Sequence, residues 1–123
     1  MKKIIFVCIL GLIVTMETQA QDNFLGYWTN EGRAQIIKIY KVDTQYYGEI
    51  IFRKDISLKE IKNKMILFQM KKRNKKTLYG GTYFDYNLNK EYEVKLELEN
   101  EKTINFTGIY GVSNIYNVWY KIP

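Results

Sequence analysis

Alternation with a period of two residues is the feature that most constrains this chain. It is clearest in the segment Glu91–Glu99, EYEVKLELE, where every second residue is apolar and the residues between are charged. Successive side chains of a β-strand point to opposite faces, whereas a helix would scatter these residues around its axis. The segment therefore predicts a strand with one dry face and one solvated face. Thr103–Tyr110 repeats the pattern, and the short polar link between the two predicts a hairpin.

Further strand-like runs follow one another at even spacing. They are rich in Tyr and Ile, which favour strands, and the one proline, which could not donate to a sheet ladder, is Pro123. A sheet of this many strands can close on itself and remove its exposed edges. We therefore predict an all-β fold, an eight-stranded antiparallel up-and-down barrel. The predicted strands are Phe24–Thr29, Ala34–Val42, Gln45–Arg53, Met65–Lys71, Thr77–Tyr86, Glu91–Glu99, Thr103–Tyr110 and Ile115–Ile122.

The segment Lys54–Lys64 is the one connection too long for a tight turn. Its apolar residues have the spacing of a short amphipathic helix, and Ser57 followed by Glu60 fits a capping box. We predict a short helix or flap here, between the third and fourth strands and over one end of the barrel.

Residues 1–20 have the pattern of a signal peptide. Two lysines precede an apolar run, Ile4–Val14, which is shorter than the about 20 residues needed to span a bilayer. Small residues before Gln21 suit cleavage. We expect residues 1–20 to be removed and residues 21–123 to form a single exported domain, periplasmic or extracellular. The alternative reading is an N-terminal membrane anchor.

The expected mature chain contains neither cysteine nor histidine, because the only cysteine, Cys8, lies in the apolar run. It therefore lacks disulfides and the usual nitrogen and sulfur ligands of transition metals, and we expect no metal and no cofactor. Its serines have no histidine to activate them, and Glu91 and Glu93 belong to the solvated face of their strand. The sequence indicates no catalytic residues, and we do not expect an enzyme.

Basic residues are concentrated between Arg53 and Lys76, where the net charge is +8, while the rest of the expected mature chain is slightly acidic. The densest part of this segment is a basic patch at the turn between the fourth and fifth strands. It is either a solvated hairpin tip or a surface for anionic partners. The patch consists of Lys71, Lys72, Arg73, Lys75 and Lys76.

The last three strands supply the candidate interior of the barrel. Their shared parity predicts that Leu98, Ile104, Val118 and Ile122 point inward together with seven candidate ligand-binding residues. Those seven are Tyr92, Val94, Leu96, Phe106, Tyr110, Tyr116 and Tyr120. An eight-stranded barrel is either filled by its side chains or holds one small ligand, and both interpretations remain open. Asp85 is read as a turn former, with a binding carboxylate at the barrel rim as the alternative.

The order of several short motifs resembles the secreted bacterial domain-of-unknown-function family 2147. The motifs are Gly26-Tyr27-Trp28, Tyr47-Gly48-Glu49-Ile50, Gly80-Gly81-Thr82-Tyr83-Phe84-Asp85, Lys90-Glu91-Tyr92, Thr107-Gly108-Ile109-Tyr110-Gly111 and Trp119-Tyr120-Lys121. The resemblance covers nearly all of residues 26–122 and implies a small barrel akin to the lipocalins, exported by Gram-negative bacteria, without supplying an activity. The chain departs from the family pattern at Tyr86, Thr107 and Lys121.

A lipocalin-like barrel also implies a role for Gly26, Trp28 and Lys121. In such barrels a tryptophan of the first strand closes the floor, and a basic side chain from the end of the last strand packs across its ring as a cation–π contact. Gly26 would let the backbone pass close to that bulk. We therefore expect these three residues to be structural.

Two functions follow from these observations. The first is a binding module that holds a small apolar or amphipathic molecule inside a monomeric barrel. The second is a structural or interaction protein of the cell envelope, with a solid barrel whose basic face, Arg53 to Lys76, docks on anionic lipid or glycan. Binding to nucleic acid is not expected, since export separates the protein from most of it.

Overall fold

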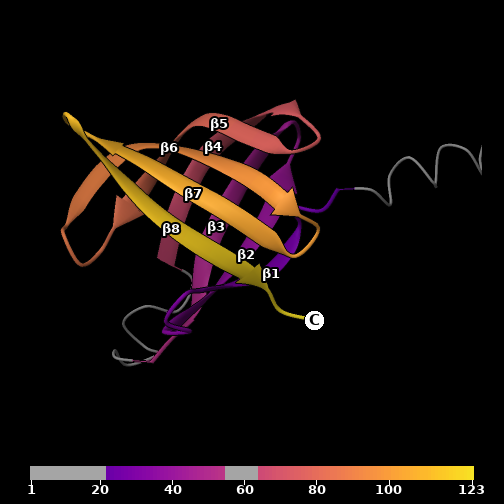
Figure 1. Cartoon of the computed structure of the whole chain (residues 1–123), viewed down its shortest axis with the longest axis horizontal. Coiled ribbons are helices and arrows are strands. Elements are labelled where there is room, and N and C mark those ends of the chain that lie inside the picture. Colours follow the sequence, from indigo (N-terminus) through magenta and orange to yellow (C-terminus); the bar gives the residue numbers. More distant parts are fainter. Residues whose placement is uncertain (1–21, 55–63) are drawn as a thin grey trace, which may run out of the picture.

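Eight antiparallel strands form the fold in a computed structural model, which describes residues 22–54 and 64–123 (Figure 1). Each strand pairs with the next in the chain, and β8 pairs with β1, so the sheet is a closed barrel in the order β1 to β8. The fold class is confirmed. The strands are β1 (Gly26–Asn30), β2 (Gln35–Val42), β3 (Gln45–Arg53), β4 (Lys64–Asn74), β5 (Thr77–Asp85), β6 (Lys90–Asn100), β7 (Thr103–Tyr110) and β8 (Ser113–Lys121).

The observed strands follow the predicted ones closely, and β3 and β7 have the predicted bounds. The largest differences are at β4, which continues three residues beyond Lys71, and at β1, which begins at Gly26 because Phe24 and Leu25 belong to a segment that leads into the barrel. The short helix or flap predicted between β3 and β4 falls mainly on residues 55–63, outside the described residues.

The hydrophobic core lies inside the barrel and is built from alternate residues of the strands. In β6 the apolar parity is buried and the charged parity is mostly exposed, as the sequence pattern predicts. The two tryptophans, Trp28 and Trp119, are the largest fully buried side chains. The core consists of Phe24, Trp28, Ile37, Ile39, Tyr46, Ile50, Ile66, Leu67, Met70, Leu78, Tyr92, Val94, Leu96, Leu98, Ile104, Phe106 and Trp119.

The two ends of the barrel differ. At one end, here called the closed end, residues 22–25 run across the opening, and Phe24 is fully buried there. The turns β2–β3, β4–β5 and β6–β7 lie at this end, on the right in Figure 1. The β1–β2, β5–β6 and β7–β8 connections lie at the other end, here called the open end.

Candidate functional site

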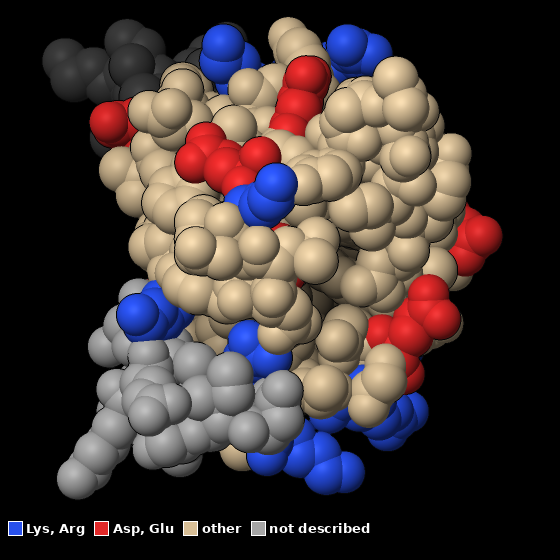
Figure 2. Space-filling view, turned by 90° about the vertical axis from the view of Figure 1, so that its left-hand side faces the viewer, with Lys and Arg blue, Asp and Glu red and all other residues tan. Residues whose placement is uncertain are grey.

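A hollow of about 230 Å³ penetrates the open end of the barrel. Figure 2 looks onto this end and shows the hollow within a mostly uncharged surface. All eight strands contribute to its lining, and β2 does so through its first residue, Gln35. The lining residues are Asn30, Ala34, Gln35, Ile50, Arg53, Ile66, Tyr83, Asp85, Tyr86, Asn87, Tyr92, Phe106, Ile115 and Asn117.

The floor of this hollow is an aromatic cluster. The ring centroid of Tyr83 lies 4.9 Å from that of Phe106 and 5.4 Å from that of Tyr92. Phe106 in turn lies 5.3 Å from Trp119, which is buried below it. The edge-on and tilted arrangements are those that aromatic pairs favour. The floor is therefore aromatic, and Trp119 and further buried core residues lie on its other side.

Arg53 reaches the mouth of the hollow because β3 contains a β-bulge. Ile37 of β2 pairs with Ile50, but the next residue, Ile36, pairs with Phe52, so Ile51 is the extra residue. A bulge reverses the parity of the residues that follow it. Phe52 consequently lies on the outer surface, whereas Arg53 turns inward opposite Gln35 and retains only 7% exposure.

Hydrogen bonds fix the polar wall of the hollow. The Arg53 guanidinium donates to the Asn87 side chain at 2.9 Å, which joins the end of β3 to the β5–β6 turn. Asp85 Oδ1 accepts from the backbone N–H groups of Asn87 and Leu88 at 2.9 and 3.1 Å. Asp85 is therefore a turn former, as interpreted from the sequence, and it also lines the hollow. The Tyr86 hydroxyl donates to the Met65 carbonyl at 3.0 Å.

The two tyrosines of the floor are held in their neutral form. Burial raises the pKa of Tyr83 to about 12, and Asp85 adds to the rise, while a hydrogen bond from Gln35 and the charge of Arg53 oppose it. Burial also raises the pKa of Tyr92, with smaller contributions from Tyr83 and Asp85. Both hydroxyls are therefore protonated at neutral pH and offer a donor as well as an acceptor.

Four of the seven candidate ligand-binding residues lie fully inside the barrel. Tyr92, Val94, Leu96 and Phe106 belong to the core, but only Tyr92 and Phe106 border the hollow. Tyr110 is partly buried against the core near the same end, with its ring 5.9 Å from that of Tyr92.

The prediction for Tyr116 and Tyr120 is wrong. Their side chains are 73% and 44% exposed on the outer surface. Pairing decides this, because Phe106 of β7 lies opposite Asn117 and Ile104 lies opposite Trp119, and paired residues share a face. β8 therefore faces inward through Ile115, Asn117 and Trp119.

At the closed end, Trp28 and Lys121 meet in the geometry expected from the resemblance. The Lys121 ammonium lies 5.3 Å from the centre of the Trp28 ring, and the two residues are register partners of β1 and β8. A Cβ on Gly26 would lie 3.2 Å from Lys121 Cε, so the absent side chain makes room for the lysine stem. These residues lie at the opposite end from the hollow.

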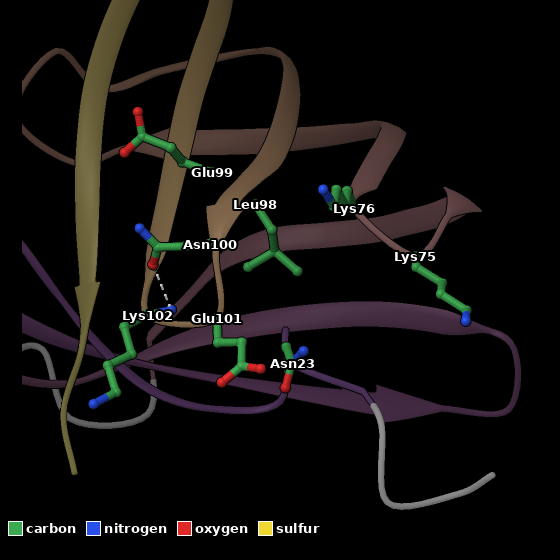
Figure 3. Close-up of a pocket in the computed structure, with 8 residues that line it drawn as sticks. All are labelled: Asn23, Lys75, Lys76, Leu98, Glu99, Asn100, Glu101 and Lys102. Carbon is green, nitrogen blue, oxygen red and sulfur yellow. Dashed lines mark hydrogen bonds between the residues drawn. The ribbon is translucent and has the colours of Figure 1, made fainter.

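A second, shallower hollow of about 660 Å³ lies at the closed end, between the β4–β5 and β6–β7 turns. In Figure 3, Lys75 and Lys76 stand on one side of it, and the β6–β7 turn stands on the other with Leu98 between them. The residues that line it are Asn23, Lys75, Lys76, Leu98, Glu99, Asn100, Glu101 and Lys102.

The basic segment Arg53 to Lys76 does not form one face, which corrects the sequence-based expectation. β4 runs from Lys64 at the open end to Asn74 at the closed end. The basic patch, Lys71, Lys72, Arg73, Lys75 and Lys76, is exposed at the closed end, whereas Arg53 is buried at the open end.

Sequence reasoning missed the polar residues of the hollow, above all Gln35, Arg53 and Asn117. Gln35 and Asn117 occupy inward positions, but alternation along a strand does not predict that an inward residue is polar. Arg53 points inward because of the bulge. The amide of Gln35, on the same parity as Ile37 and Ile39, was the one signal that the sequence offered. Within residues 22–54 and 64–123, no group of three or more Asp, Glu, His or Cys side chains could hold a metal ion. The same residues include no helix long and apolar enough to cross a membrane.

Comparison with known proteins places the chain in a family. A solved structure whose description reads "Protein HP1028 from the human pathogen Helicobacter pylori belongs to the lipocalin family" superposes with a TM-score of 0.66. It is 16% identical, and the match covers 80% of this chain and 82% of that one, which shows a shared fold. No curated protein matches significantly. The family described as "Uncharacterized protein conserved in bacteria (DUF2147)" matches residues 26–120. The chain therefore belongs to the DUF2147 family, and its barrel is lipocalin-like.

Proposed function

We propose that this protein binds a small amphipathic molecule in the hollow at the open end. The observation that carries the proposal is the make-up of the hollow, in which an aromatic floor meets walls of amide side chains and a buried guanidinium. Binding sites for small molecules combine apolar walls with a few convergent polar groups in the same way. The apolar part of the ligand would rest on Phe106 and Tyr92, and its polar end would meet Arg53.

The size of the hollow limits the ligand. Its about 230 Å³ is below the roughly 300–1,000 Å³ of typical ligand pockets. At roughly 30 Å³ for each water-sized group, it holds about eight non-hydrogen atoms. Trp119 and the core beneath it fill the barrel below the floor. A six-carbon carboxylic acid matches this volume, whereas a long-chain fatty acid exceeds it.

The charge around the hollow favours an anionic polar end. Arg53 carries a permanent positive charge at a position that is only 7% exposed, where weak solvent screening strengthens its attraction for an anion. Asp85 lines the same wall and also carries a charge, but its Oδ1 is turned toward the backbone N–H groups of Asn87 and Leu88. The anionic group of a ligand should therefore lie at Arg53 and away from Asp85. We therefore assign the ligand a carboxylate or a similarly small anionic group.

Straight-chain carboxylates from acetate to decanoate test the proposal. Trp119 lies directly beneath the floor, so its fluorescence should report occupancy, and a Trp28→Phe background removes the other tryptophan. We expect affinity to rise roughly fourfold for each added CH₂ group, following about 0.8 kcal/mol per buried group. The rise should stop near six carbons, where the hollow is full. If no carboxylate alters Trp119 fluorescence or thermal stability, the binding proposal is wrong.

Arg53→Gln tests the charge assignment. This variant should bind hexanoate at least tenfold more weakly, because it loses a charge-assisted contact. Its affinity for hexanol should change little. Lys54→Gln is the matched control, since it removes a charge from the exposed neighbouring residue. Equal hexanoate binding by Arg53→Gln and the parent, or tighter binding of hexylamine than of hexanoate, would overturn the anionic assignment and leave the location of the site intact.

A further inference from the structure

We propose that the closed end of the barrel docks on the surface of an anionic phospholipid bilayer. This inference concerns the end opposite the proposed ligand site and does not depend on it. It starts from three lysines, Lys75, Lys76 and Lys102, that surround the shallow hollow of Figure 3.

These three ammonium groups are not neutralised by the described part of the protein. The ion pairs seen among residues 22–54 and 64–123 are Lys72–Asp22 and Lys95–Glu97, and neither involves them. Glu99 and Glu101 line the same hollow without coming within ion-pair distance of the lysines. Unpaired positive charges gathered around one concave surface attract an anionic partner.

Rigid turns hold the lysines in place. The Asn74 side chain accepts from the Lys76 backbone N–H at 2.9 Å, and the Asn100 side chain accepts from the Lys102 backbone N–H at 2.8 Å. The Lys76 carbonyl also accepts from the Leu98 N–H at 2.8 Å, which ties the two turns together. The backbone that carries these lysines is therefore held in place, so binding need not order a flexible loop.

Positive charge extends beyond the hollow over the whole closed end. Arg73 stacks over the ring of Tyr79 at 4.4 Å, and Lys71 is exposed beside it. Nine basic residues and five acidic ones lie at or near this end, so a positive excess remains. The basic residues are Lys41, Lys71, Lys72, Arg73, Lys75, Lys76, Lys95, Lys102 and Lys121, and the acidic residues are Asp22, Asp43, Glu97, Glu99 and Glu101.

An exposed apolar residue on the neighbouring turn favours a bilayer over a soluble polyanion. Val42 is 51% exposed at the end of β2 and pairs with Gln45, which itself pairs with Lys71 of β4. A bilayer offers a plane of phosphates for the lysines and an apolar boundary for the valine at the same time. A dissolved phosphate or an acidic glycan offers no apolar contact.

Vesicle co-sedimentation tests the proposal. The protein is the chain starting at Gln21, which contains all eight strands and the whole buried core. The probes are vesicles of phosphatidylcholine alone and of phosphatidylcholine with about a third phosphatidylglycerol. We expect binding to the anionic vesicles only, weakening as salt is raised because the Debye length shortens.

Two triple variants with the same change in charge locate the contact. Lys75→Gln, Lys76→Gln and Lys102→Gln together should lower partitioning into anionic vesicles at least tenfold. The matched control is Lys54→Gln, Lys64→Gln and Lys90→Gln, which removes three exposed lysines at the open end and should retain partitioning within about twofold. All six substitutions replace exposed side chains, so both variants should fold.

The outcomes separate the proposal from its rivals. No binding to anionic vesicles, or equal losses in the two triple variants, would overturn it. Val42→Ser should weaken vesicle binding and leave binding to heparin, a soluble acidic glycan, unchanged. If instead heparin binds the parent more tightly than the vesicles do, and Val42→Ser has no effect on either, the partner is a glycan and the bilayer assignment is wrong.

Discussion

A single tryptophan fastens the segment that closes the barrel. Trp28 Nε1 donates to the Phe24 carbonyl at 2.9 Å, and its ring receives the Lys121 ammonium. The same ammonium donates to the Asn23 carbonyl at 3.1 Å. Residues 23 and 24 are thus held from two sides by one residue of the first strand and one of the last. These contacts of Trp28 and Lys121 hold the chain together, in keeping with the structural role that the resemblance implies for the two residues.

Trp28→Ala should therefore destabilise the barrel by about 3–5 kcal/mol, because it removes a fully buried ring and leaves a cavity. Lys121→Met should cost about 1 kcal/mol by removing the cation–π contact, and Lys121→Arg should retain most of it. Urea unfolding measures these changes in the free energy of unfolding. Lys95→Met, at a partly exposed lysine of β6, is the control and should change it by less than about 0.5 kcal/mol. An unchanged stability in Trp28→Ala would show that the closed end contributes nothing to folding.

At the scale of the strand, the sequence predicts which face points into the barrel only where the other face is charged. β6 has a charged parity and an apolar one, so its inner face followed from the sequence. β8 has no charged face to mark its outer side. The set without a polar amide, Tyr116, Val118 and Tyr120, faces outward. The other set, Ile115, Asn117 and Trp119, faces the interior. Tyrosine tolerates either side because its ring is apolar and its hydroxyl is not. Only the pairing with β7, a long-range contact, settles the orientation.

The bulge at Ile51 escaped prediction for a related reason. A strict period of two in β3 places Phe52 inside and Arg53 outside, and no residue type marks the insertion. The extra residue is specified by how β3 must bend to pair with β2, which is a property of the closed sheet. Because this irregularity places Arg53, the polar wall of the hollow could not be read from the local sequence.

Glycine in β5 marks another constraint that belongs to the pairing of strands. A Cβ on Gly81 would overlap the carbonyl oxygen of Phe68 and lie 2.8 Å from the backbone nitrogen of Met70, and backbone cannot move aside as a side chain can. Gly81→Ala should therefore destabilise the protein by about 3 kcal/mol. Gly32→Ala is the control, because nothing lies within 4 Å of its Cβ position, and it should stay within about 0.5 kcal/mol of the parent. Equal unfolding midpoints in urea for the two variants would contradict the close approach of β4 and β5.

At the scale of the whole molecule, closing the sheet distributes the polar and charged residues between two ends. β4 spans 11 residues, so its ends are roughly 33 Å apart at the usual rise of a strand. A basic segment that is continuous in sequence is therefore divided in space, with Arg53 in the mouth of the hollow and the basic patch at the closed end. The number and order of the strands were predictable from local patterns. The separation of Arg53 from the basic patch, at opposite ends of the barrel, follows only from the closed topology.

Buried tyrosine hydroxyls from different strands should make the stability of the barrel depend on alkaline pH. Burial raises the pKa of Tyr83 to about 12, and it also raises the pKa values of Tyr92 and Tyr46, the latter with help from its hydrogen bond to Asp22. Because each folded-state pKa lies above the ordinary value of 10.0, the unfolded chain loses its protons first. The associated stability is complete below pH 10 and decreases as pH rises toward 12.

Urea unfolding at a series of pH values measures this effect. The contribution of these tyrosines to the free energy of unfolding should be nearly constant from about pH 7 to 9 and should fall steeply above pH 10. Tyr83 alone should account for about 2 kcal/mol of that fall, since each pKa unit corresponds to about 1.4 kcal/mol and partial solvent access reduces the total. Tyr83→Phe cannot ionise and should flatten the fall by that amount. Tyr116→Phe, at an exposed position, should leave the slope as it is in the parent. If the two variants respond alike, the hydroxyl of Tyr83 is open to water in the folded protein. The aromatic floor of the hollow is then not sealed, and the proposed binding site, which depends on that floor, is not supported.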